Sequence, residues 1–143
     1  MALAIILIAG SSWWFAPRAT LELPHAADCD LNRGPCSTAL PSGGSIELAI
    51  EPRPVPVLEP LALRVRLRGV EADAVEVDFS GVGMNMGYNR PRLARAGPDE
   101  FTGSGTLPVC VTGAMAWDAT VLVQAGRRTI AAPFRFEAWP HAS

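Results

Sequence analysis

The six residues Leu-Arg-Val-Arg-Leu-Arg at positions 63–68 decide the fold class. Apolar and charged side chains alternate strictly here, which is the pattern of a β-strand with one buried face. The same alternation predicts a strand on either side, at residues 46–51 and 75–79. Further strands are expected at residues 100–106, 119–124 and 129–137, with a hairpin turn at Gly126 and Arg127.

These short strands predict an all-β protein. No stretch after Ser45 shows a sustained period of 3.6 residues, so helix is limited to one or two turns. The Pro-rich link at residues 51–60 excludes a helix or a central strand, and we expect an extended connection or an edge there. Strands with turn signals about every 8–12 residues predict a single antiparallel β-sandwich of immunoglobulin-like type over residues 45–139.

The composition excludes an intrinsically disordered chain and nucleic-acid binding. Of the 143 residues 49% are hydrophobic and only 18% are charged, so the chain can bury the core of one domain. The formal net charge of -2 does not provide the basic surface that nucleic acid requires.

The amino-terminal segment is typical of a targeting sequence. Residues 2–16 carry no charge, and as a helix they would span roughly 22 Å, short of the ~30 Å hydrocarbon core of a bilayer. We expect residues 1–18 to be a signal peptide or a membrane anchor, with Trp13 and Trp14 before Arg18 favouring the anchor. A buried segment of the domain is the remaining alternative. Either kind of targeting predicts a periplasmic location, free or at the outer face of the inner membrane.

Residues 19–44 are expected to be a tether that contains a disulfide loop. In an exported protein two of the three cysteines should pair, and the turn-forming residues between Cys29 and Cys36 favour that pair. Closing so short a loop stabilises by roughly 2.5 kcal/mol in the chain-entropy model. A bridge from Cys110 to either of the others stays open from sequence alone.

Soft metal donors are concentrated in two segments. Met84 and Met86 lie one residue apart between two glycines, and in an extended chain they would point to the same face. Cys110 and Met115 follow in the second segment, just before Trp117. Thioethers suit Cu(I) and scarcely hold harder divalent ions. If the segments meet at one end of the sandwich, these four residues suffice for a trigonal or tetrahedral Cu(I) site, with Trp117 as a wall that excludes water and oxygen.

Core packing is the alternative for each of these residues, because methionine fills irregular gaps and a free cysteine is usually buried and inert. Every methionine except the initiator lies in the two segments, and this concentration favours copper. His25 in the tether and His141 in the tail are expected to be solvated. Solvated or turn-capping roles are expected for three carboxylates: Asp78, Asp99 and Asp118.

No catalytic constellation can be assembled, so we do not expect an enzyme. Cys110 has no histidine in a segment that would hold a base against it, and no zinc-ligand spacing is present. Arg64, Arg66 and Arg68 form a basic stripe on the exposed face of their strand. Such a stripe serves solubility or edge protection, and less often the docking of an acidic partner.

The exported sandwich, the Met84 and Met86 loop and the segment from Cys110 to Trp117 resemble the small periplasmic copper-handling β-sandwiches of the YtkA-like and CopC-like families. The resemblance covers residues 45–137. It implies copper binding, or copper transfer to a respiratory oxidase or a resistance system, and no catalysis. The His-rich copper sites common in such proteins are absent here, and Cys29 and Cys36 match no pattern of the family.

Two functions are therefore in competition. The first is a membrane-anchored periplasmic Cu(I)-binding protein that delivers copper to an acceptor or respiratory protein of the envelope, or maintains copper homeostasis. The second is a membrane-tethered interaction module without a metal, which joins a larger envelope complex through its arginine stripe and its Gly-rich loop.

Overall fold

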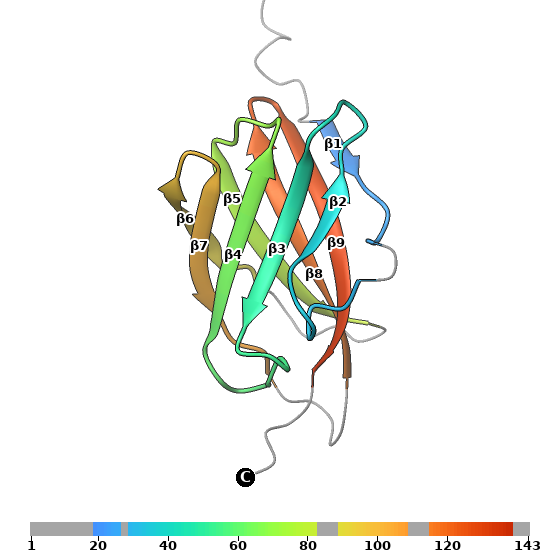
Figure 1. The fold of residues 1–143 in the computed structure, drawn as a ribbon, viewed down its shortest axis with the longest axis vertical. Helices are drawn as coiled ribbons and strands as arrows, with labels where there is room; N and C mark the ends of the chain where they lie inside the picture. Colours follow the sequence, from blue (N-terminus) through green and yellow to red (C-terminus); the bar gives the residue numbers. More distant parts are fainter. Residues whose placement is uncertain (1–18, 27–28, 83–88, 109–114, 139–143) are drawn as a thin grey trace, which may run out of the picture.

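Nine β-strands and no helix make up the described part of the chain (Figure 1). The computed structural model describes residues 19–26, 29–82, 89–108 and 115–138. The strands are β1 (Ala19–Glu22), β2 (Cys36–Ala39), β3 (Ser45–Glu51), β4 (Leu61–Arg68), β5 (Ala74–Gly81), β6 (Arg92–Gly97), β7 (Glu100–Gly105), β8 (Met115–Ala125) and β9 (Arg128–Ala138). The predicted all-β class is confirmed.

The strands form one curled sheet in the order β1-β9-β8-β5-β6-β7-β4-β3-β2. Figure 1 shows the curl as two layers, with β7, β4, β3 and β2 in front of β5, β8 and β9. Strand β6 pairs with both β5 and β7 and so connects the layers. The sheet is mixed, because β1 pairs with β9 in parallel. The prediction of a purely antiparallel sheet is wrong at this edge, since it did not include a strand before Ser45.

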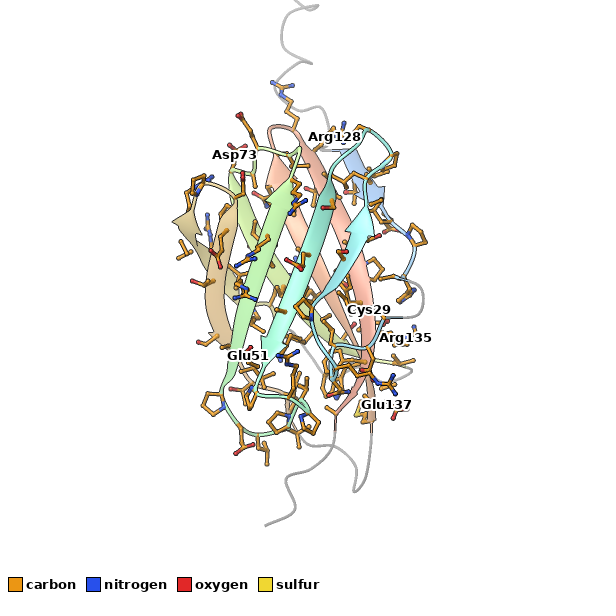
Figure 2. The ribbon with its side chains drawn as sticks, viewed as in Figure 1. Cys29, Glu51, Asp73, Arg128, Arg135 and Glu137 are labelled. Atoms are coloured by element: carbon orange, nitrogen blue, oxygen red, sulfur yellow. A yellow bond between two sulfur atoms is a disulfide. The ribbon has the colours of Figure 1, made fainter. Side chains whose placement is uncertain are left out.

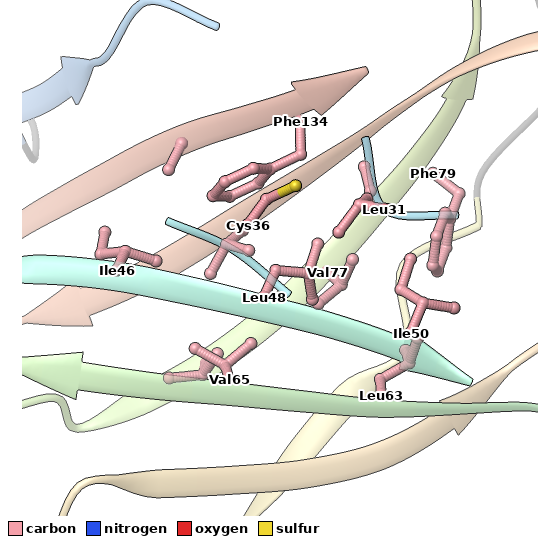
Figure 3. Close-up of a cluster of buried hydrophobic side chains, with 14 of the residues drawn as sticks. Leu31, Cys36, Ile46, Leu48, Ile50, Leu63, Val65, Val77, Phe79 and Phe134 are labelled. Atoms are coloured by element: carbon pink, nitrogen blue, oxygen red, sulfur yellow. The ribbon is translucent and has the colours of Figure 1, made fainter. Parts of the chain in front are cut away.

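Alternation of side chains produces the core. Along β4 every second side chain, from Leu61 to Leu67, is buried, while the arginines between them point outward. Strand β9 is built in the same way, with Ile130, Phe134 and Phe136 facing inward. Figure 3 shows side chains of both layers meeting in this cluster. Burying each such side chain stabilises the fold by roughly 1.5–3 kcal/mol.

The predicted tether contributes to the same core. Residues 19–44 supply β1 and β2 to opposite edges of the sheet. Among the described side chains of this segment four are buried: Leu23, Leu31, Cys36 and Leu40. Leu31 and Cys36 lie among the core residues in Figure 3. This segment is therefore packed against the sandwich along the part of it that the structure describes.

Cys29 and Cys36 form a disulfide, with their Cα atoms 5.8 Å apart, as the turn between them predicts. Cys110 and residues 1–18 lie outside the described residues, so the free thiol and the role of the apolar segment stay predictions. The described residues contain no helix that is both long and apolar enough to span a membrane.

Candidate metal centre

The two segments with soft donors leave the sheet at the same end. Gly81, the last residue of β5, is paired with Trp117 of β8. The Val82 amide donates a hydrogen bond to the Ala116 carbonyl, with 3.1 Å between N and O. We call this end the donor pole and define it by Gly81, Val82, Leu107, residues 115–117 and Ala138. Met84, Met86 and Cys110 lie outside the described residues, but the structure brings their flanking residues together.

Met115 is the one predicted ligand within the described residues. It is the first residue of β8, opposite Ala138 of β9. It shares the inward-facing side of β8 with Trp117 because side chains alternate along a strand. Its side chain is partly buried and packs against the core. This position suits a filler of the core, and it equally suits a ligand at the end of that core.

Trp117, two residues after Met115 in β8, has a buried indole N–H without a hydrogen-bond partner in the described structure. Its side chain is fully buried. Tryptophan N–H groups usually find a partner when buried, and leaving one unpaired costs about 1–3 kcal/mol. The structure shows that Trp117 is buried in β8, and its role as the wall of a copper site stays a prediction.

The disulfide loop is hydrogen-bonded to β9 next to the donor pole. The Asn32 side chain accepts a hydrogen bond from the Val55 amide at 2.7 Å and donates one to the Glu137 carbonyl at 2.8 Å. Arg53 donates to the Arg33 carbonyl at 3.1 Å, so the Pro-rich link is joined to the same loop. Figure 2 shows Cys29 and Glu137 toward one end of the domain and Arg128 at the other. Sequence reasoning missed the role of Asn32, because its two partners are distant in the chain.

A second polar cluster lies on the outer face of β8. Arg135 makes two hydrogen bonds to Asp118, at 3.0 and 3.2 Å, and His25 Nε2 lies 3.2 Å from Asp118 Oδ1. Burial raises the pKa of Asp118, but the hydrogen bond and charge of Arg135, followed by those of His25, outweigh it and lower the pKa. The reciprocal interaction raises the pKa of Arg135.

The prediction that Asp118 is merely solvated or caps a turn is therefore wrong, because cross-strand pairing places it directly opposite Arg135. His25 is half-exposed, yet it is held to the sheet by the same carboxylate. Since Asp118 and Trp117 are consecutive in β8, they face opposite sides of the layer. The described His25 cluster thus lies on the outside of the layer, and His141 lies outside the described residues.

Three of the remaining charged candidates, Arg64, Arg66 and Asp78, make surface ion pairs. Arg64 and Arg66 both lie near Glu100, at 3.8 and 3.9 Å, on the outer face of the front layer. Asp78, predicted to be solvated or turn-capping, is 3.3 Å from Arg90. The described residues contain no group of three or more His, Cys, Asp or Glu side chains that could hold a metal ion.

Comparisons with known proteins give information on the fold and none on function. No family model matches the chain, and no curated protein matches it. One similar solved structure is the crystal structure of an engineered protein, with a TM-score of 0.50 and 19% sequence identity over 71% of this chain. The chain spans about a fifth of that protein's length, 21%. At this identity the likeness concerns the fold and carries nothing about function.

Proposed function

We propose that the protein is a membrane-anchored Cu(I)-binding protein of the periplasm, built on an immunoglobulin-like sandwich, and that it acts in copper delivery or homeostasis. The metal ligands are Met84, Met86, Cys110 and Met115. The observation that carries the proposal is the hydrogen bond between Val82 and Ala116, because it joins the flanks of both donor-bearing segments at one pole. The resemblance to copper-handling sandwiches implies a respiratory oxidase or a resistance system as the acceptor.

The donor set determines which metal the site would take. Three thioethers and one thiol are soft ligands, which favour Cu(I) over the harder divalent ions. Met115 is already at the inner edge of the pole, against the core, and the buried Trp117 lies on the same face of β8. An apolar floor of this kind keeps water away from a bound ion and so protects the reduced state of copper.

A metal-free interaction module is the second candidate. It is favoured by the basic stripe on the front layer, where Arg66 and Arg68 are exposed and the distances from Arg64 and Arg66 to Glu100 are long for ion pairs. An acidic surface of a partner would fit this stripe. In that case the methionines fill gaps at the end of the core and hold no metal.

A Cu(I) competition experiment separates the two candidates. The full chain and the Met84→Leu/Met86→Leu variant are titrated against a chelator of known affinity, without oxygen and with the disulfide intact. Leu conserves the volume of Met and usually costs under about 1.5 kcal/mol, so the variant should fold. Its Cu(I) binding should collapse, because Leu offers no donor atom.

Asn85→Leu is the matched control, because it introduces the same side chain into the same loop and keeps both thioethers. We expect this control to bind Cu(I) as the wild type does. Equal binding by the wild type and the double variant, or no binding by the wild type, would reject the copper site and favour the interaction module.

A further inference from the structure

The outer face of the front layer carries its charged side chains in separate stripes. Figure 1 looks onto this layer, which consists of β7, β4, β3 and β2. The outward charged side chains of β4 are three arginines: Arg64, Arg66 and Arg68. Strand β3 on one side carries Glu47 and Glu51, and β7 on the other side carries Glu100. A basic stripe therefore lies between two acidic ones.

The register between β3 and β4 places an opposite charge or a small residue beside each long side chain of this face. Glu47 is paired with Arg66. The other three pairs join a long residue to a small one: Arg68 to Ser45, Arg64 to Ala49, and Glu51 to Ala62. Ser45 lines an open hollow of about 600 Å³, and Ala49 lines one of about 280 Å³. Each long side chain on one strand thus has space beside it on the other.

Some charges of this face are available to a further partner. The side chains of Glu47 and Arg68 make no hydrogen bond or ion pair with the described residues. Arg66 is exposed, and its Nε lies 3.9 Å from a carboxylate oxygen of Glu100, which is long for an ion pair. A second surface can therefore engage these groups with little loss of existing interactions.

A second copy of this chain matches the face after a half-turn about an axis that runs along the strands, between β3 and β4. This rotation places β3 of one copy over β4 of the other and keeps the height along the strands. Arg66 of each copy then comes over Glu47 of the other, and Arg68 comes over Ser45. A half-turn about an axis across the strands would place β4 over β4 and bring arginines together, which is unfavourable.

We propose that this face is a self-association surface and that its partner is a second copy of the chain in the arrangement just described. In a two-fold dimer the same patch serves both copies, so each favourable pair occurs twice. An acidic partner protein, the alternative, would match the arginines but would meet Glu47, Glu51 and Glu100 beside them, and like charges across an interface are unfavourable. This association needs no metal and is independent of copper binding.

The area of the face predicts a weak dimer. Four strands about 4.8 Å apart, with a length of about 24 Å for β3, give a flat area of roughly 450 Å² on each copy. Stable interfaces bury about 800 Å² on each partner, and smaller ones are typical of transient complexes. We therefore expect a dissociation constant in the micromolar range or weaker, which rises with ionic strength because the paired charges are exposed.

Sedimentation equilibrium of the full chain and its charge-reversed variants tests the surface. The solvent matches the density of the detergent that the apolar residues 2–16 require, so only protein contributes. Glu47→Arg and Arg66→Glu each replace both reciprocal pairs by like charges, and the double variant restores opposite charges across the two-fold axis. Glu22→Arg is the matched control, because it reverses an exposed glutamate on β1, which pairs with β9 of the back layer.

We expect the wild type and Glu22→Arg to dimerise equally. Each single reversal on the face should weaken the dimer by about tenfold or more, since the two-fold axis doubles every unfavourable contact. The double variant should recover most of the lost affinity. Substitutions at positions that are not buried rarely disturb folding, and thermal unfolding of each variant checks this.

Four results would overturn the self-association surface. They are a wild type that stays monomeric at every concentration, a dimer that Glu47→Arg leaves unchanged, equal weakening by Glu22→Arg, and no recovery in the double variant. A monomeric wild type that binds poly-glutamate would favour an acidic partner instead.

Discussion

Leu31→Ala tests whether the disulfide loop is part of the core. Leu31 is 0% exposed and lies between the paired cysteines. Removing a buried leucine side chain costs about 2.7–5.0 kcal/mol, and more where the site cannot collapse. The disulfide and the hydrogen bonds of Asn32 hold this loop in place, so it cannot collapse into the cavity. We therefore expect the free energy of unfolding to fall by about 3–4 kcal/mol. Stability of many domains totals only 5–15 kcal/mol, so the effect is large.

The assay is urea unfolding of the oxidised protein. The slope of the unfolding free energy against urea concentration should be the same in wild type and variant. Leu58→Ala is the matched control, since it makes the same chemical change at a side chain that is 66% exposed. Its cost should stay within about 0.5 kcal/mol. If Leu31→Ala costs no more than Leu58→Ala, the loop does not pack as the structure shows, and residues 19–44 are the tether that the sequence predicts.

Two further predictions concern charge and the third cysteine. Because Arg135 and His25 lower the pKa of Asp118 against the effect of burial, its carboxylate stabilises the fold above the pKa of unfolded Asp, about 3.9. Asp118→Asn should therefore lower the free energy of unfolding by about 1 kcal/mol or less near neutral pH. The difference between wild type and variant should fade as the pH falls through the lowered pKa of folded Asp118. Thermal unfolding from about pH 2 to 6 measures this difference, and a difference independent of pH would contradict the prediction. Alkylation of the oxidised protein should add one label, on Cys110, by intact mass, whereas a label on Cys36 would contradict the pairing.

Most of the strands could be predicted because their burial has a local signature. Residues 63–68, 75–79 and 129–137 alternate between apolar and polar side chains, and each lies in an observed strand. The turn at Gly126 and Arg127 is also confirmed. The pairing of Cys29 with Cys36 followed from the turn residues between them.

Strands β1, β2 and β6 could not be predicted, since their partners and not their own patterns determine them. Strand β1 has four residues and gains its hydrogen bonds from β9, more than a hundred residues later. Strand β6 is largely exposed, with Leu93 its single buried side chain. A short or exposed strand shows no clear alternation, and sheet pairing decides it.

For the candidate site, the sequence predicts which sulfur donors would hold copper, and this stays a prediction. The sequence concentrates the sulfur donors in two segments, and the pairing of β5 with β8 brings the described flanks together. The roles of Asn32 and Asp118 depend on contacts between distant elements. No sequence pattern within a single segment indicates such contacts.

The most direct test of copper ligation by these sulfur donors is X-ray absorption at the copper edge. The full chain is loaded with one equivalent of Cu(I), without oxygen and with the disulfide intact. We expect sulfur atoms alone to surround the ion, supplied by Met84, Met86, Cys110 and Met115. The sulfur signal should weaken in the Met84→Leu/Met86→Leu variant, which keeps only Cys110 and Met115 as donors, and it should stay unchanged in Asn85→Leu. Nitrogen or oxygen neighbours in the wild type, or an unchanged sulfur shell in the double variant, would contradict the claim.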